Sequence, residues 1–336
     1  MPDYQPPFTI TDTTLRLVAD IGEAVGRLSA NLELEQNLRL RRINRMRTVR
    51  GSLAIEGNTL TEEQITVILA GKRVIAPPKE VKEAHNAISA YELLTSWNPT
   101  INKDLLAAHK TLMIGLVEEA GMYRSAGVGV MSGKDVVHMA PQADRVPKLM
   151  ADLFAWLRST DTHPLIASCV FHYEFEFIHP FSDGNGRVGR LWQTLILSQW
   201  QPVFINIPVE SLVHQHQEDY YRAIRQSTSQ SDSSPFVEFM LRMILSAIAE
   251  AETASDSVGI NVGISVGLKL SVKLSDQDIA LLALIRTDPF VTMDKLAKSL
   301  GKSVRTVERR IKYLKENNLI SRVGAKKSGK WIVHRE

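Results

Sequence analysis

The chain has 336 residues, 44% of them apolar, and a net charge of +3. This length suits two domains, or one large domain with a small one appended, and no apolar run approaches the roughly 18 residues of a membrane span. The first residues lack the basic, apolar and small-residue progression of a signal peptide, so we expect a cytoplasmic protein. Cys169 is the single cysteine, which excludes an internal disulfide, and its apolar surroundings favour a buried packing residue over a reactive thiol.

Charge is distributed unevenly along the chain. Residues 301–336 contain eleven Lys or Arg and three Asp or Glu, a balance of +8, so the other 300 residues carry −5. The C-terminal end is therefore suited to contact anions.

Residues 12–250 read as mainly helical. Ser52 and Glu56 are four residues apart, on one helical face, and Gly57-Asn58 predicts the end of that helix. A carboxylate in the last helical turn is poorly placed against the helix dipole, and an arginine partner would offset the cost.

The next helices have clear periodicity. Thr61 and Gln64 form a capping-box pattern that opens a helix to about Ala70. Apolar residues at three- and four-residue spacing predict three more helices, at 80–97, 103–116 and 147–159. Between the last two, Val128–Met131 and Val136–Ala140 flank Ser132-Gly-Lys-Asp, which predicts a short β-hairpin.

Residues 179–190, His-Pro-Phe-Ser-Asp-Gly-Asn-Gly-Arg-Val-Gly-Arg, join two predicted helices at 165–178 and 187–200. The Gly184-Asn185-Gly186 turn can direct backbone N–H groups to one point at the start of the second helix, where an anion is favoured. Arg187 and Arg190 project from that helix on the same side. The pattern predicts a polyphosphate site.

Two more residues of this loop suggest chemistry. Asp183 could hold Mg²⁺ against phosphate oxygens, and His179 stands where a general base would accept a proton from a hydroxyl. Taken singly, each feature has an ordinary explanation: a core histidine, a simple turn, a solvated arginine pair. Their occurrence together in one loop favours the functional interpretation.

The C-terminal part predicts a second domain. Glycines among β-branched residues indicate a linker at 251–272, which separates a domain at 1–250 from one at 273–336. Three predicted helices, at 276–286, 292–300 and 303–317, followed by two short strands, are typical of a winged helix-turn-helix. Its candidate DNA-contacting residues are Arg305, Arg309 and Arg310 on the third helix and Lys326, Lys327 and Lys330 on the wing. The alternative is a docking domain whose basic face meets an acidic protein or a second protomer.

The string His179–Arg190 resembles the full motif of the Fic family, HPFx(D/E)GNGRxxR, at every fixed position. Ser52–Asn58 resembles the family's (S/T)xxxE(G/N) inhibitory motif. The resemblance implies a mainly α Fic fold with a small β-hairpin flap, joined to a C-terminal winged helix-turn-helix. Gly121-Met-Tyr-Arg124 also resembles the family's approach to the flap.

The resemblance further implies a protein adenylyltransferase that uses ATP and Mg²⁺. His179 would deprotonate a Tyr, Thr or Ser of a target protein, Asp183 would bind Mg²⁺, and Glu56 would inhibit the enzyme by pairing with Arg190. The implied ATP-binding residues are Phe181, Ser182, Asp183, Gly184, Asn185, Gly186, Arg187, Arg190, Tyr220 and Tyr221.

Partners and alternatives follow from the same reading. Self-modification and a homodimer are compatible with it, as is DNA binding through 273–336, whereas no membrane is expected. One alternative keeps the loop but transfers another phosphate-containing group or removes AMP. Another is a DNA-binding regulator whose Fic fold senses a nucleotide, although such a sensor need not keep His179.

Overall fold

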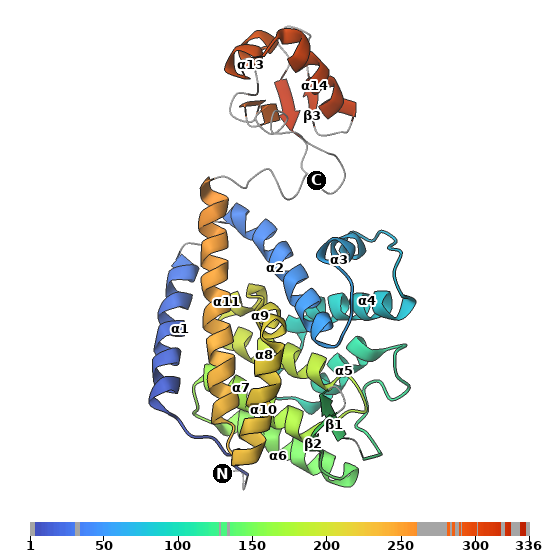
Figure 1. The fold of residues 1–336 in the computed structure, drawn as a ribbon, viewed down its shortest axis with the longest axis vertical. Coiled ribbons are helices and arrows are strands. Elements are labelled where there is room, and N and C mark those ends of the chain that lie inside the picture. Colours follow the sequence, from blue (N-terminus) through green and yellow to red (C-terminus); the bar gives the residue numbers. More distant parts are fainter. Residues whose placement is uncertain are drawn as a thin grey trace. The chain divides into compact units, whose positions relative to one another are not determined.

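A computed structural model describes residues 4–30, 34–127, 129–132 and 135–260. Between residues 281 and 333 it describes 281–282, 284–285, 289, 291–300, 302–316, 320–323 and 330–333. The chain divides into two compact units, Met1–Ser255 and Asp256–Glu336 (Figure 1). No helix within these described ranges combines the length and the apolar character that crossing a bilayer requires.

The first unit is helical, which confirms the predicted fold class. Its α-helices are α1 (Asp12–Ala30), α2 (Leu34–Ile55), α3 (Glu62–Leu69), α4 (Pro78–Leu93), α5 (Asn102–Met113), α6 (Val146–Ser159), α7 (Pro164–Ile178), α8 (Asn185–Trp200), α9 (Val209–Gln215), α10 (Gln217–Gln230) and α11 (Ser234–Ile260). Short 3₁₀ turns occur at Leu94–Ser96, Ala143–Arg145 and Pro202–Asn206.

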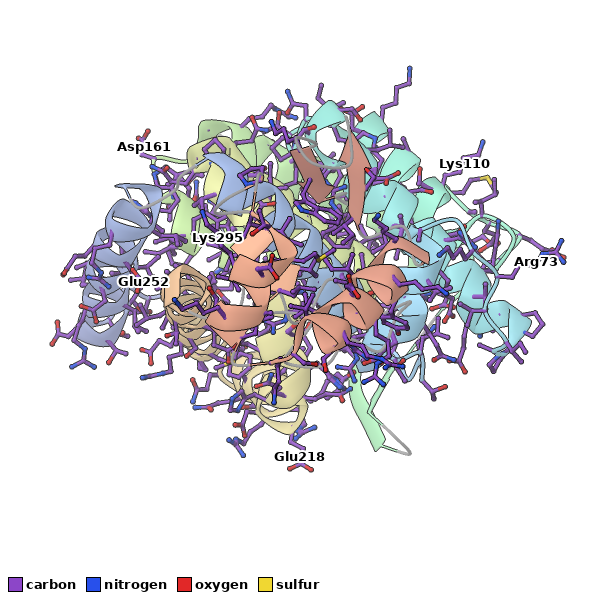
Figure 2. The ribbon with its side chains drawn as sticks, turned by 90° about the horizontal axis from the view of Figure 1, so that it is seen from above. Arg73, Lys110, Asp161, Glu218, Glu252 and Lys295 are labelled. Atoms are coloured by element: carbon purple, nitrogen blue, oxygen red, sulfur yellow. The ribbon has the colours of Figure 1, made fainter. Side chains whose placement is uncertain are left out.

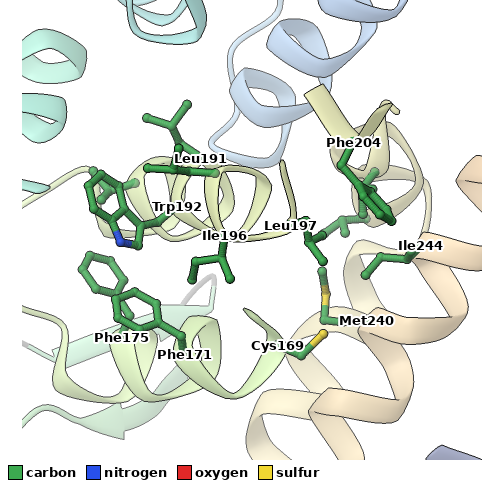
Figure 3. Packing of buried hydrophobic residues seen from close by; sticks show 14 of the residues in the cluster. Cys169, Phe171, Phe175, Leu191, Trp192, Ile196, Leu197, Phe204, Met240 and Ile244 are labelled. Atoms are coloured by element: carbon green, nitrogen blue, oxygen red, sulfur yellow. The ribbon is translucent and has the colours of Figure 1, made fainter. Parts of the chain in front are cut away.

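Helices α7 and α8 form the centre of this unit. α7 is buried on almost every side because it is apolar all round, and its aromatic side chains pack against α8 (Figure 3). Phe171 and Phe175 face Trp192, and all three are fully buried. Each such side chain contributes about 1.5–3 kcal/mol through burial, so this pair of helices is a rigid support for the loop between them.

Cys169 lies in this core. Its side chain is fully buried, and burial raises the pKa of its thiol to about 12. The thiol therefore stays protonated at neutral pH, as expected for a packing residue.

Helix α2 crosses α9 at a glycine. A Cβ atom on Gly51 would lie 2.6 Å from the backbone nitrogen of Ser211, so only glycine permits this approach. Close by, the Ser211 hydroxyl donates to the Arg47 carbonyl at 2.9 Å. These contacts fix the C-terminal half of α2 against α9.

Two local predictions are confirmed. Thr61 caps α3, and its side chain and that of Gln64 exchange hydrogen bonds with each other's backbone N–H. Strands β1 (Gly129–Ser132) and β2 (Asp135–Met139) pair antiparallel as a hairpin. Val128 and the turn residues 133–134 lie outside the described residues.

At the edge of the unit, α1 and α11 lie side by side, joined by an Arg27–Glu252 ion pair of 3.2 Å. Exposed charged side chains such as Asp161 and Glu218 project outward (Figure 2). α11 continues to Ile260, so the first ten residues of the predicted 251–272 linker are helical. The rest of that linker lies outside the described residues, and the domain limits 1–250 and 273–336 stay predictions.

The second unit contains α13 (Met293–Leu300), α14 (Val304–Glu316), β3 (Ile320–Val323) and β4 (Lys330–Val333), and residues 281–282 and 284–285 are helical. β3 and β4 pair antiparallel. Trp331 closes the core: its backbone N–H donates to the Pro289 carbonyl at 2.8 Å and its indole N–H to the Val291 carbonyl at 3.1 Å. This arrangement agrees with the predicted winged helix-turn-helix.

Candidate functional site

His179 stands at the end of α7 in a left-handed conformation. Its φ of 50° is unusual for a residue other than glycine, and its N–H still bonds the Phe175 carbonyl. Arg124, almost fully buried, holds this turn: its Nε donates to the His179 carbonyl at 2.8 Å, and its own N–H donates to the Pro180 carbonyl at 2.9 Å. Arg124 therefore fixes the backbone that carries His179.

The loop after His179 is closed by Asn185. The Asn185 side chain accepts from the Phe181 N–H at 2.9 Å and donates to the Phe181 carbonyl at 2.8 Å. Asn185 was predicted as part of the phosphate-binding turn. Its side chain, which is buried, holds the loop in shape, and its backbone N–H remains at the start of α8.

His109 supports the loop from below. Its ring stacks on Phe181, with 3.7 Å between ring centroids. Its Nδ1 accepts from the Gly121 N–H, so the proton sits on Nε2, which donates to the Asp183 carbonyl at 3.0 Å. Burial lowers the pKa of His109 to about 4, so the ring is neutral at physiological pH.

The start of α8 is shaped to receive an anion. Gly184 precedes the helix with a φ of 86°, and a Cβ there would lie 2.6 Å from the Met113 sulfur. The N–H groups in the first turn of a helix have no carbonyl acceptor within the helix. In α8 these N–H groups belong to residues 185–187. Together with the helix dipole they favour a phosphate group at this point.

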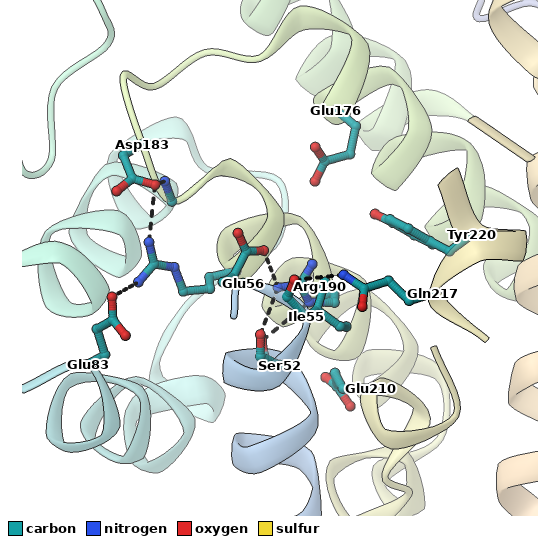
Figure 4. A network of polar contacts seen from close by, with 12 residues as sticks. Ser52, Ile55, Glu56, Glu83, Glu176, Asp183, Arg190, Glu210, Gln217 and Tyr220 are labelled. Atoms are coloured by element: carbon teal, nitrogen blue, oxygen red, sulfur yellow. Dashed lines mark hydrogen bonds and ion pairs between the residues drawn. The ribbon is translucent and has the colours of Figure 1, made fainter. Parts of the chain in front are cut away.

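Arg187 lies between two carboxylates. Its Nη2 is 3.1 Å from Oδ1 of Asp183, and its Nη1 is 3.5 Å from Oε1 of Glu83 (Figure 4). Within the described part of the chain, its Nε is buried without a hydrogen-bond partner. A phosphate oxygen is an acceptor that suits this donor.

Asp183 has the exposure expected of a cation ligand. Its side chain is 51% exposed, and Oδ1 accepts from the Gly184 N–H. The described residues contain no group of three His, Cys, Asp or Glu side chains that could hold a metal ion by themselves. One carboxylate is enough for Mg²⁺ when phosphate oxygens supply further ligands, so Asp183 fits that cation.

Arg190 is buried and bound to the end of α2. Its Nη2 lies 2.7 Å from Oε1 of Glu56 and 3.0 Å from the Ser52 carbonyl, and its Nε donates to the Ser52 hydroxyl at 3.3 Å (Figure 4). Burial alone would lower the pKa of Arg190, but the Glu56 carboxylate raises it above its usual value. The predicted pairing of Glu56 with Arg190 is thus present as a contact.

The chain on either side of Glu56 is held by neighbouring helices. Gln217 of α10 donates to the Ile55 carbonyl at 2.8 Å. On the other side, Asn58 donates to Oε2 of Glu83 at 2.9 Å, and Oε2 of Glu80 accepts from the Thr59 N–H at 2.7 Å. We call residues 52–58 the inhibitory segment, after the motif that they resemble.

One cavity of about 200 Å³ brings these groups together. Its wall includes His179, the residues from Ser182 to Gly186, Arg190 and Glu56. Tyr220 and Tyr221 line the same cavity, and their role in binding ATP stays a prediction. Tyr220, however, is only 2% exposed and its hydroxyl lies 3.3 Å from Nε2 of His172, whereas Tyr221 is partly exposed. Tyr221 is therefore the more accessible of the two rings.

Glu176 also lines the cavity and was missed from the sequence. Its Oε2 lies 3.9 Å from Nδ1 of His179, one helical turn further along α7. Burial raises the pKa of Glu176 to about 7, although nearby Arg190 lowers it. The i, i+3 spacing from His179 on an apolar helix is the signal that could have identified it.

The second unit carries the candidate DNA residues on α14. Arg305 and Arg309 are exposed and share one face, to which the exposed Lys312 adds charge. Arg310 lies on another face, with its guanidinium 5.1 Å from the Tyr313 ring. Lys330 is exposed at the start of β4, while Lys326 and Lys327 lie outside the described residues.

Comparisons with known proteins agree with this geometry. The model of the Fic/DOC family matches residues 99–197, and that of a winged helix-turn-helix DNA-binding family matches 274–321. A crystal structure of a Fic family protein from Desulfovibrio desulfuricans G20 is 47% identical and covers 99% of both chains, with a TM-score of 0.74. Fic-1 (residues 134–508) from C. elegans is 23% identical over 72% of this chain and 73% of its own, with a TM-score of 0.62, which is a likeness of fold.

Curated relatives match a smaller share of the chain than these two structures do. "Protein adenylyltransferase Fic" of Nematostella vectensis is 32% identical over 206 residues, which are 57% of this chain and 45% of that protein. The protein of the same name from Culex quinquefasciatus is 32% identical over 205 residues, 56% of this chain and 38% of that one. The chain thus spans less than half the length of these curated relatives.

Proposed function

The chain belongs to the Fic/DOC family, and from that premise we propose that it transfers AMP from ATP to hydroxyl side chains of proteins. The observation that carries the proposal is the placement of His179, the N-terminus of α8 and Arg190 around one cavity. Arg187 is not on the cavity wall but lies directly behind it, 3.1 Å from the lining residue Asp183. The names of the curated relatives support AMP as the transferred group.

The residues of the cavity divide the chemistry among them. His179 accepts the proton of the target hydroxyl, whose oxygen attacks the α-phosphorus of ATP while pyrophosphate leaves. The N–H groups at the start of α8, with Arg187 and Arg190, hold the phosphates and neutralise their charge. Mg²⁺, when bound by Asp183 and phosphate oxygens, adds positive charge against the leaving group.

We propose that Glu56 inhibits the reaction. The Glu56–Arg190 contact of 2.7 Å occupies the guanidinium that the outer phosphate of ATP needs. Because Arg190 is only 3% exposed and is also bonded to Ser52, ATP cannot recruit it without displacing Glu56. Nucleotide then binds with misaligned phosphates, and transfer is slow.

The test uses ATP labelled at the α- or the γ-phosphate, with Mg²⁺ and three full-length proteins: wild type, Glu56→Gly, and Glu56→Gly with His179→Ala. We expect α-label on protein, including on the enzyme itself, to be strong in Glu56→Gly, weak in wild type and absent without His179. Equal labelling of wild type and Glu56→Gly would remove the inhibitory role of Glu56.

Other outcomes identify the alternatives. Label from the γ-phosphate means phosphorylation, and release of α-label from a previously labelled protein means removal of AMP. No label with Glu56→Gly, together with retained ATP binding, favours a regulator that senses nucleotide. Light scattering of the full chain, alone and with ATP, reports whether it forms a homodimer.

A second candidate function is DNA binding by the second unit, because Arg305 and Arg309 form an exposed basic face on α14. Such contacts reach phosphates, so binding to random duplex DNA should weaken steeply with salt. Replacing both arginines with alanine in the full chain should lower the salt slope by about 2. No binding at low salt would leave protein docking as the role of this unit.

A further inference from the structure

Glu83 contacts both the phosphate site and the inhibitory segment. Its Oε1 lies 3.5 Å from Nη1 of Arg187, and its Oε2 accepts from Nδ2 of Asn58 at 2.9 Å. Its side chain is 11% exposed, so the carboxylate is largely shielded from water. The inhibitory segment therefore reaches both arginines of the loop: Arg190 directly through Glu56, and Arg187 through Glu83.

The two carboxylates beside Arg187 are not equivalent. Asp183 is half exposed, on the rim of the cavity, and is the residue that fits the cation. A cation bound by Asp183 would compete with Arg187 for the charge of this carboxylate. Glu83 would then be the carboxylate left to orient the Arg187 guanidinium, whose Nε is buried without a hydrogen-bond partner among the described residues.

Resting on the proposed function, we propose that Glu83 is a positioning residue with two roles: it aligns Arg187 for the phosphates of ATP, and through Asn58 it holds the inhibitory segment in its blocking position. The two roles have opposite effects on activity. In an enzyme already released from inhibition, such as Glu56→Gly, loss of Glu83 weakens ATP binding. In the inhibited wild type, loss of Glu83 raises activity.

Glu80 provides a matched control. It lies on the same helix and bonds the same loop, with Oε2 accepting from both the N–H and the hydroxyl of Thr59, at 2.7 and 2.8 Å. The contacts described for Glu80 include no arginine of the phosphate site. Glu80→Gln and Asn58→Ala should thus loosen the loop without changing how ATP is held.

The experiment compares Glu83→Gln, Glu80→Gln and Asn58→Ala, each in full-length wild type and in Glu56→Gly. In wild type, at saturating ATP, all three should raise labelling about threefold or more: Asn58→Ala removes the donor of a hydrogen bond, and the two Gln variants replace a charged acceptor by a weaker neutral one. In Glu56→Gly, Glu83→Gln should raise the KM for ATP about fivefold or more, as expected for a lost charge-assisted contact, while the two controls stay within about twofold. Glu83→Asp, which keeps the charge, should recover part of that KM.

The opposing result is equally clear. If Glu83→Gln lowers labelling in both backgrounds with an unchanged KM, Glu83 only supports the fold and the proposal is wrong. The proposal is also wrong if the two controls raise KM as much as Glu83→Gln does.

Two readouts do not depend on catalysis. They therefore distinguish failure of the Glu83 proposal from failure of the proposed AMP transfer. Calorimetry measures ATP affinity directly, and Glu83→Gln alone should weaken it. Hydrogen exchange at the Thr59 and Leu60 amides, which bond Glu80 and Asn58, should accelerate in all three variants. Unchanged exchange in Glu83→Gln would exclude its hold on the segment, whatever the reaction proves to be.

Discussion

Arg190 contacts Ser52 twice, at the side chain and at the backbone. Its Nε donates to the Ser52 hydroxyl at 3.3 Å, and its Nη2 donates to the Ser52 carbonyl at 3.0 Å. Only the first of these bonds depends on the identity of residue 52. The carbonyl contact, and the ion pair with Glu56, remain when the hydroxyl is removed.

Ser52→Ala should therefore release the enzyme only in part. Loss of one hydrogen bond, worth about 0.5–1.5 kcal/mol, predicts a rise in α-label incorporation of about two- to tenfold. The rise should be smaller than that of Glu56→Gly measured beside it. An effect as large as that of Glu56→Gly would mean that the serine, and not the ion pair, holds Arg190.

Gln217→Leu should also raise basal labelling, because it removes the donor that binds the Ile55 carbonyl at the end of α2. The carbonyls of a last helical turn have no partners further along the helix, so this side chain stabilises the turn that carries Glu56. We expect a gain of about two- to fivefold, from roughly 0.5–1 kcal/mol. Glu218→Gln, an exposed neighbour on α10, is the control and should leave labelling as it is.

Glu176→Gln should change how stability depends on pH. The pKa of Glu176 is raised to about 7 in the folded protein, so the folded state binds the proton more tightly than the unfolded chain does. The contribution of Glu176 to the free energy of unfolding therefore falls as pH rises from about 4.5 to about 7, and is constant above that. Glutamine does not ionise and avoids this loss.

Urea unfolding at pH 5 and pH 8 measures the effect. At pH 8 the variant should be about 2–3 kcal/mol more stable than wild type, and at pH 5 the difference should be below about 1 kcal/mol. The charged groups that face Glu176 are Arg190 and Glu56, and His172 and His179 lie within 4 Å. A variant less stable at pH 8 than wild type would show that the ionised carboxylate is stabilised by these neighbours.

Gly184→Ala should destabilise the protein and weaken ATP binding. The residue has a φ of 86°, and the added Cβ would meet the Met113 sulfur at 2.6 Å. An alanine held at this positive φ costs about 1–3 kcal/mol of stability by itself. Moving its Cβ away from the Met113 sulfur would also displace the start of α8. Gly22→Ala is the control: it lies in exposed helix with nothing within 4 Å of the new Cβ and should stabilise by about 0.5–1 kcal/mol.

Local patterns predicted much of the fold. The Thr61–Gln64 capping box, the hairpin near residue 130 and the limits of α14 depend on residues that are close in the chain, and the structure agrees with them. The loop from His179 to Arg190 was predictable for the same reason. Its roles in binding and catalysis stay predictions.

Contacts between distant segments were not predictable from spacing. Arg124, His109 and Glu83 reach the loop from other helices and turns. His109 and Glu83 are ordinary residues in their own sequence context, and the motif around Arg124 did not indicate its contact with the His179 carbonyl. Asn185 is instructive because its type suggested a turn, yet its side chain bonds the backbone of Phe181. Only the folded chain places these groups near one another.

Gly51 limits how the inhibitory segment can move. Since a single added carbon at this position would collide with the Ser211 nitrogen, α2 has no clearance to slide or roll over α9. The least costly route for Glu56 to leave Arg190 is then to unwind the final helical turn beyond the crossing, with the remainder of α2 staying in place. If Glu56 inhibits as proposed, an activating signal needs to unwind only these few residues, of which Glu56 and Gly57 are exposed.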